Sequence, residues 1–144
     1  MCTCTAEIKE TYAKLRHQTA EVTRQQFDID DYLDKIIDVK QQINRVIHET
    51  NALVELVRNH FTELDVQETI ELLAHSTPIL ILMDQLHRKL MESSLNAGLE
   101  NTIEEYADCV SDFQELCNDL QTFNIDLRQD REFLASSAFL RSIA

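Results

Sequence analysis

The sequence predicts an all-α fold, an antiparallel helical bundle built from long, coiled-coil-like helices. Two observations carry this prediction. The 144 residues include one glycine, Gly98, and one proline, Pro78, whereas sheets need many tight turns rich in both residues. Apolar residues also recur at alternating steps of four and three over more than seven heptads, a spacing typical of packed helices. We therefore expect four main helices and a short C-terminal one in a single domain, residues 1–144, with a disordered tail at residues 1–5.

The first two helices are expected along a heptad seam. Its positions are Ile8, Tyr12, Leu15, Thr19, Val22, Gln26, Ile29, Leu33, Ile36, Lys40, Ile43, Ile47, Thr50, Val54, Val57 and Phe61. One unbroken register permits a single helix over residues 8–61, about 80 Å long at 1.5 Å per residue. Asp28, however, is a good N-cap, and Phe27 and Tyr32 could staple the entry of a new helix. We favour a break near residue 27, with helices near residues 6–26 and 28–62, and keep the continuous helix as the alternative.

The third helix is expected to begin at a capping box formed by Asp65 and Glu68. Pro78 has no N–H to donate and clashes with the preceding turn, so the helix should kink, or restart with Thr77 as a new cap. The segment after it, residues 79–83, is apolar on all sides. This predicts burial all round, in the middle of the bundle or under a partner subunit. Gly98 should end the helix in the left-handed conformation.

The last long helix is expected to begin with Asn101 as its N-cap and Glu104 three residues on. Its predicted core face comprises Ile103, Tyr106, Val110, Phe113, Cys117, Leu120 and Leu127, with Asn124 as a polar member. The segment REFLASSAFLRSIA, residues 131–144, has the pattern of a separate short amphipathic helix.

The formal net charge of −13 limits the possible partners. Nucleic acid and anionic membranes are poor partners, because both are bound through positive charge on the protein. The N-terminal residues lack the apolar run of a secretion signal, and no apolar stretch is long enough to span a membrane. Cys2 and Cys4 could form half of a metal or redox site, but no second pair has ligand spacing. We expect a cytoplasmic protein with reduced thiols and no cofactor.

An acidic stripe on the last long helix is the first candidate functional surface. Residues 100–119 hold seven acids and no base. Six of them follow helical spacing on the side opposite the core face, namely Glu100, Glu104, Asp108, Asp112, Glu115 and Asp119. The simplest interpretation is a solvated face that keeps the protein soluble. The alternatives are a docking strip for a basic partner, which is the partner-binding site we single out, and mimicry of nucleic-acid charge.

His87 is the second candidate, as an alternative phosphoacceptor. The stretch from His87 to Gly98 has roughly the layout of a histidine phosphotransfer module, a family whose pattern is about H-x-x-K-G-S on a bundle helix. Only its tail, Ser93, Ser94, Asn96 and Gly98, resembles the family, with an offset of one residue. That resemblance implies a phosphoryl group carried on His87. The chain departs from the pattern, because Lys89 stands one residue too early and Met91 occupies the place of the glycine. Small residues such as Ser93 before a glycine cap are common in any helix, so an ordinary surface histidine is the simpler interpretation.

Metal and catalytic sites have weaker support. Three pairs of a histidine and a carboxylate have the spacing that shares a helix face, namely Glu71 with His75, Asp84 with His87, and His60 with Glu63. The histidines flank the apolar seams, so we expect solvated side chains and no metal. No glycine-rich loop or activated nucleophile is evident. The sequence therefore favours a non-catalytic, self-associating bundle with a protein-binding, regulatory or scaffold role over an enzyme.

Overall fold

The computed structural model describes the backbone of residues 4–25 and 32–143, and the side chains of residues 5–25 and 34–123. Four α-helices follow one another, α1 (Cys4–Arg24), α2 (Tyr32–Asn59), α3 (Val66–Glu92) and α4 (Glu100–Ile143). Two short 3₁₀ helices, η1 (Phe61–Glu63) and η2 (Ser94–Gly98), connect α2 to α3 and α3 to α4. No strand occurs in the described ranges. The predicted all-α helical bundle is confirmed.

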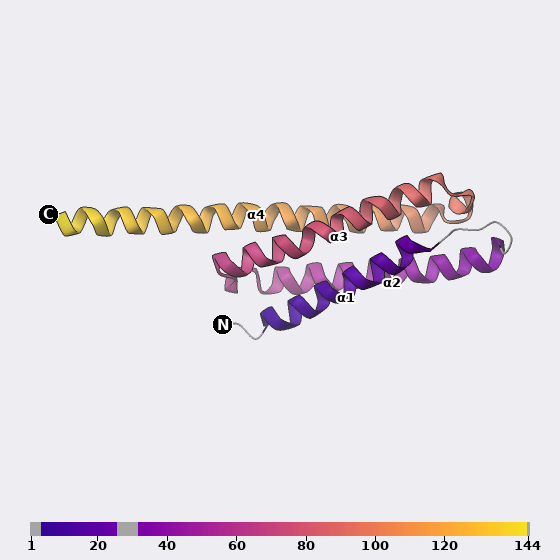
Figure 1. Ribbon diagram of the computed structural model, residues 1–144, viewed down its shortest axis with the longest axis horizontal. Helices are drawn as coiled ribbons and strands as arrows, with labels where there is room; N and C mark the ends of the chain where they lie inside the picture. Colours follow the sequence, from indigo (N-terminus) through magenta and orange to yellow (C-terminus); the bar gives the residue numbers. More distant parts are fainter. Residues whose placement is uncertain (1–3, 26–31, 144) are drawn as a thin grey trace.

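The helices form a bundle in which α1 and α4 occupy opposite corners. Helix α1 packs on α2 and α3, and α4 packs on the same two helices. Successive helices run in opposite directions, so that α1 is antiparallel to α4 as well as to α2 (Figure 1). The rings of Tyr12 in α1 and Phe113 in α4 approach within 6.2 Å at the bundle centre. Helices α1 and α4, although diagonal to each other, therefore share one hydrophobic core.

The predicted break between the first two helices is confirmed, since α1 ends at Arg24 and α2 begins at Tyr32. The proposed N-cap Asp28 and the staple residue Phe27 lie outside the described residues. Helix α1 begins at Cys4, inside the tail expected at residues 1–5. Thr5 is buried there and its hydroxyl donates to Glu68 of α3. This hydrogen bond fixes the first turn of α1 against α3.

The heptad seam describes α1 well and α2 only in part. Its five positions in α1 are all buried, namely Ile8, Tyr12, Leu15, Thr19 and Val22. In α2 the buried positions are Val39, Ile43, Val46, Thr50, Leu53 and Val57. Only three of these lie on the seam, and its member Lys40 is exposed. The buried positions of α2 follow a 4–3 register of their own, which shares every seventh residue with the predicted seam and is shifted by one residue at the positions between. The buried face is therefore rotated towards Val39, Val46 and Leu53.

The capping box at the start of α3 is confirmed. The Asp65 carboxylate accepts from the backbone N–H of Glu68 at 2.8 Å, and the Glu68 carboxylate accepts from the backbone N–H of Asp65 at 3.2 Å. Glu68 is buried and also accepts from Thr5. The two carboxylates therefore accept hydrogen bonds from two backbone N–H groups that have no partner within the helix, and from the Thr5 hydroxyl of α1.

Removing this cap should destabilise the bundle measurably. Asp65→Ala leaves the Glu68 backbone N–H without its side-chain acceptor, and loss of an N-cap typically costs about 1 kcal/mol. We expect a drop of that size in the free energy of unfolding, measured by urea denaturation. Asp65→Asn, which keeps an acceptor oxygen, is the matched control and should lose only a few tenths of that amount. Equal losses in both variants would contradict a role for the cap.

Helix α3 does not restart at Pro78, so the expected new start with Thr77 as its cap is wrong. The helix runs through it, and the Thr77 hydroxyl donates to the Leu73 carbonyl within the same helix, so Thr77 is no cap. The carbonyl that Pro78 leaves without a backbone donor belongs to Ala74, an exposed residue, where water can supply the hydrogen bond. The expected all-round burial after Pro78 is also wrong, since Ile79 and Met83 are buried but Ile81 is 55% exposed.

The C-terminal part of the bundle differs most from the prediction. Helix α3 ends at Glu92, and η2 separates it from α4. No described residue has a positive φ, so Gly98 is not a left-handed cap. Helix α4 begins at Glu100, which places Asn101 inside the helix. It continues for 44 residues to Ile143, so residues 131–143, where a separate short helix was expected, belong to α4. No glycine or proline follows Gly98 to interrupt it.

The end of α4 extends well beyond the other helices (Figure 1). The α4 contacts within the bundle reach at least to Phe123, whose ring lies 4.7 Å from that of Phe61 beside α2. Beyond this point the backbone of α4 lacks a neighbouring helix in the described ranges (Figure 1). Most of the stability of helices in proteins comes from packing an apolar face against a neighbour.

Candidate functional site

The acidic stripe lies on the outer side of α4. Glu100, Glu104, Asp108, Asp112 and Glu115 are exposed. The buried residues of the helix, among them Tyr106, Phe113 and Leu120, occupy the opposite side of its circumference. The carboxylates are therefore available to solvent or to another molecule.

Asp119, the last member of the stripe, differs from the others. Its carboxylate accepts from the Arg58 guanidinium of α2 at 3.1 Å, and both side chains are partly exposed. The same two residues line a shallow hollow of about 430 Å³ together with Phe61, Thr122 and Phe123. Asp119 thus marks the side of the stripe that faces α2, at the place where α4 leaves the bundle.

His87 lies at the junction of α3 and α4. It lines a hollow of about 280 Å³ together with Asp84 and Gln114 and with apolar side chains, namely Leu80, Met83, Ala107 and Val110. Its ring stacks near Tyr106, at a centroid separation of 6.4 Å. This lining contains a carboxylate and no lysine or arginine. Lys89, the lysine nearest to His87 in sequence, donates instead to the backbone carbonyl of Thr23 in α1 at 2.7 Å.

The histidine–carboxylate pairs do not converge into larger clusters. Across residues 4–25 and 32–143, no group of three or more histidine, cysteine or acidic side chains could hold a metal ion. The imidazole of His60 and the carboxylate of Glu63 lie 2.7 Å apart. Glu71 forms an ion pair with Lys9, and the hydrogen bond from Lys9 is the main reason that the pKa of Glu71 is lowered.

Two tyrosines and two cysteines are buried in the core, where they contribute to packing, namely Tyr12, Tyr106, Cys109 and Cys117. The Tyr106 hydroxyl donates to the Met83 carbonyl at 2.6 Å, and the Tyr12 and Ser76 hydroxyls hydrogen-bond at 3.0 Å. Burial raises the pKa of both tyrosines. Burial likewise raises the pKa of the Cys109 thiol to about 12 and also raises that of Cys117. All four groups are neutral at physiological pH.

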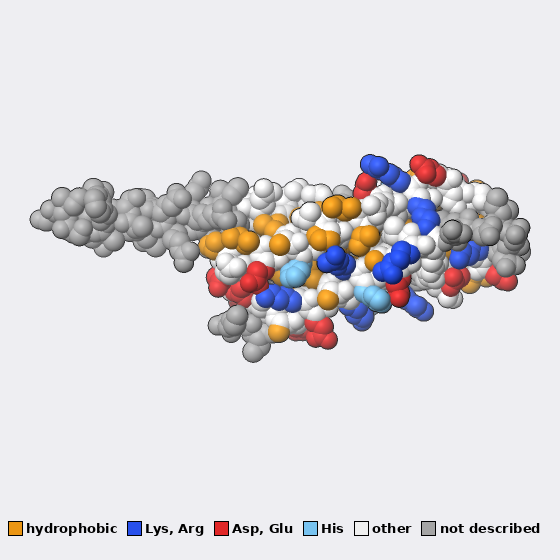
Figure 2. Space-filling model, in the orientation of Figure 1, with side chains coloured by type: hydrophobic (Ala, Val, Ile, Leu, Met, Phe, Trp, Pro, Cys, Tyr) orange, Lys and Arg blue, Asp and Glu red, His pale blue; other side chains and the backbone are white. Residues whose placement is uncertain are grey.

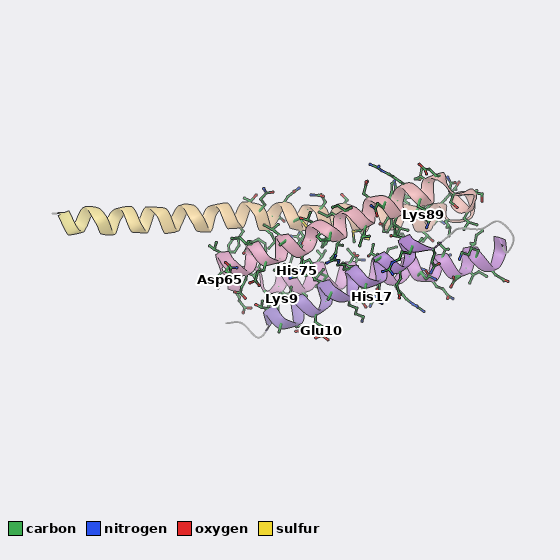
Figure 3. The ribbon with its side chains drawn as sticks, in the orientation of Figure 1. Lys9, Glu10, His17, Asp65, His75 and Lys89 are labelled. Carbon is green, nitrogen blue, oxygen red and sulfur yellow. The ribbon has the colours of Figure 1, made fainter. Side chains whose placement is uncertain are left out.

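A basic groove between α1 and α3 is the feature that sequence reasoning missed. It is a hollow of about 370 Å³ lined by Lys9, Tyr12, Ala13, Arg16, His17, Ala20, Arg24 and His75. Lysine and arginine side chains and two histidines follow this junction on the surface (Figure 2), with Lys9 and His17 on α1 and His75 on α3 (Figure 3). The sequence does contain a signal for this groove. Lys9, Arg16 and Arg24 are separated by seven and then eight residues, a spacing that places all three on one face of a helix.

The basic groove and the acidic stripe lie on opposite sides of the molecule. The groove follows α1, the corner diagonal to α4, and the stripe faces outward from α4 towards the α2 side. The described residues include no helix long and apolar enough to cross a lipid bilayer. Comparisons with protein-family models, with curated proteins and with solved structures gave no match.

Proposed function

We propose that this chain is a non-catalytic protein–protein interaction module, a scaffold or regulatory bundle that acts in the cytoplasm and associates with itself. The observation that carries the proposal is the separation of charge. An outward row of carboxylates on α4 and a basic groove beside α1 give one molecule two faces of opposite sign. Such faces steer association with a complementary surface and fix its orientation.

Two apolar features agree with this proposal. Ile37, Ile81 and Met91 are more than half exposed, and exposed large apolar side chains gain from being covered by another molecule. The end of α4 also leaves the bundle as a helix without a neighbour in the described ranges (Figure 1). Leu127 and Leu134 are one heptad apart in the sequence of this segment, the spacing of a helix that packs against another helix.

Neutralising the stripe tests the proposal. In the variant Glu104→Gln, Asp108→Asn, Asp112→Asn, Glu115→Gln, relief of like-charge repulsion should raise the free energy of unfolding by roughly 0.5–1 kcal/mol in total. Light scattering at tens of micromolar should nevertheless show a lower mass than that of the unmodified protein. Association should also become slower and less dependent on salt, because a charged surface acts mainly on the on-rate.

A matched control removes four exposed acids elsewhere, namely Glu10, Asp38, Glu55 and Glu92. It carries the same net charge as the stripe variant and should associate like the unmodified protein. The proposal is wrong about the stripe if both variants associate equally, with the same rate at low and high salt. It is wrong about self-association if the unmodified protein is a monomer throughout.

A further inference from the structure

The basic groove concentrates positive charge on a strongly acidic protein. Its lining contains three cationic side chains, two histidines and no acid, while the whole chain has 26 acids against 13 bases. Neighbouring acids engage two of the groove residues, since Lys9 pairs with Glu71 and His17 lies 3.1 Å from Glu21. Arg16 and Arg24 form no ion pair with any residue in the described ranges. Both guanidinium groups are exposed and can receive an anion.

Positive charge continues at the end of the groove nearest Arg24. Lys89 of α3 crosses this junction and donates to the Thr23 carbonyl at 2.7 Å. Burial and the nearby ammonium of Lys35 lower the pKa of Lys89. Burial is the larger cause of this lowered pKa, and the smaller one is repulsion between the ammonium groups of Lys89 and Lys35, which lie near one another at this end of the groove. An anionic group placed at this end would relieve that repulsion.

The cations are arranged in a row along α1. Lys9, Arg16 and Arg24 are separated by seven and then eight residues, which spaces them over about 22 Å along the helix at 1.5 Å per residue. A single phosphate group is bound by donors that converge on one point. A row of this length instead suits an extended row of acids, such as one face of an acidic helix.

The acidic stripe of the same protein has the matching spacing. Glu100, Asp108 and Glu115 are exposed and separated by eight and then seven residues. In the opposite chain direction, the α1 cations from Arg24 to Lys9 are also separated by eight and then seven. An antiparallel alignment therefore brings all three acids opposite all three cations. In the parallel alignment the two outer pairs also coincide, but Asp108 and Arg16 are offset by one residue, about 1.5 Å along the helix, so the antiparallel alignment gives the better match.

We propose that the basic groove binds α4 of a second copy of this chain, antiparallel to α1, with Glu100 facing Arg24, Asp108 facing Arg16 and Glu115 facing Lys9. The inference rests on the proposed self-association and names its two surfaces. Within one copy α1 and α4 already run antiparallel (Figure 1), so the docked copy keeps the orientation of the first. Each copy then offers an unused groove on one side and an unused stripe on the other, which gives an open row of copies.

Exchanging the charges between the two surfaces tests this arrangement. One variant carries Arg16→Glu and Arg24→Glu, and the other carries Glu100→Arg and Asp108→Arg. Each alone presents like charges on both surfaces, so its association constant should fall about tenfold or more below that of the unmodified protein, since like-charge juxtaposition costs several kcal/mol. An equimolar mixture restores opposite charges at both kinds of contact. We expect sedimentation velocity to show that the mixture regains the larger species.

The control for the first variant is Lys40→Glu with Arg45→Glu, two exposed cations of α2 outside the groove. It has the same net charge and should associate like the unmodified protein. Circular dichroism should show all variants folded, because every substituted side chain is exposed. If the groove variant associates as the control does, or if the folded mixture stays dissociated, the groove does not bind α4.

Failure of this inference is distinguishable from failure of the proposed function. Self-association of the unmodified protein without any dependence on Arg16 and Arg24 overturns the groove contact and leaves the interaction module standing. An unmodified protein that stays monomeric overturns both the groove contact and the proposed self-association. If such a monomer binds a polyglutamate peptide and loses this binding in the groove variant, the occupant is an acidic partner and the second copy is excluded.

Discussion

The free energy of unfolding should fall as the pH rises above about 9, because the core holds thiols that cannot ionise in place. Burial raises the pKa of Cys109 from 9.0 to about 12. The unfolded thiol therefore loses its proton near pH 9, while the folded one keeps it until about pH 12. The stabilisation is fully present below pH 9 and is lost between these two values. Within that window Cys109 alone should remove about 1.4 kcal/mol per pH unit.

Urea unfolding at pH 8, 9 and 10, followed by circular dichroism, measures this slope. Cys117 acts in the same direction, since burial raises its pKa too. Above about pH 10, Tyr12 and Tyr106 also lower the free energy of unfolding, because burial raises their pKa above the ordinary value of 10.0. The variant Cys109→Ala with Cys117→Ala should show a much shallower decline between pH 9 and 10. An equal decline in that variant and in the unmodified protein would show that the thiols are not responsible.

Phe113→Ala should be the most destabilising single substitution that we predict, at about 3–5 kcal/mol, the usual cost of truncating a buried aromatic side chain. Phe113 is fully buried, and its ring lies 6.2 Å from that of Tyr12 across the bundle. The cavity would therefore open at the point where α4 and α1 meet. Such a loss is a large fraction of the stability of a typical domain, and urea denaturation would measure it.

Phe123→Ala is the matched control on the same helix. Its ring packs on Phe61 at 4.7 Å, but it is only partly buried at the end of the bundle. Truncation there should cost clearly less, about 1–2 kcal/mol, because less surface returns to water and the pair contributes about 0.5–1.5 kcal/mol. A Phe123 variant as unstable as the Phe113 variant would place the centre of the core elsewhere.

Local signals predicted the parts of the fold that depend on local chemistry. The capping box of Asp65 and Glu68 forms as its spacing indicates, and the heptad positions of α1 are buried. The rotated face of α2, with Lys40 exposed, could not be derived in this way. Periodicity shows that a helix has an apolar face, whereas the direction of that face depends on which other helices it contacts.

The errors in the second half of the chain have a common cause. The sequence predicts the usual helix-end roles for Gly98, Asn101 and Pro78, but α3 continues through Pro78 and α4 begins before Asn101. Loss of a favoured cap costs about 1 kcal/mol and a proline inside a helix about 3 kcal/mol, and packing along a long helix outweighs both. The exposure of Ile81 shows the same limit, because a wholly apolar segment can still face outward on one side.

The candidate site was predictable only in part. The spacing of the acids placed the stripe on the outside of α4, which agrees with their exposure. The basic groove was not predicted, because it needs two helices that are far apart in sequence, α1 with Arg16 and α3 with His75. The net charge of −13 also gives no indication of the groove, because a net charge does not show how the charged side chains are distributed over the surface.

The mass of the unmodified protein in solution tests the central claim most directly. Sedimentation equilibrium from low to tens of micromolar protein, at about 50 mM and about 300 mM salt, covers both weak and strong screening. We predict a mass that rises with concentration above the 16.7 kDa of one chain and that rises less at the higher salt. A mass of 16.7 kDa at every concentration and at both salt levels would contradict a self-associating module.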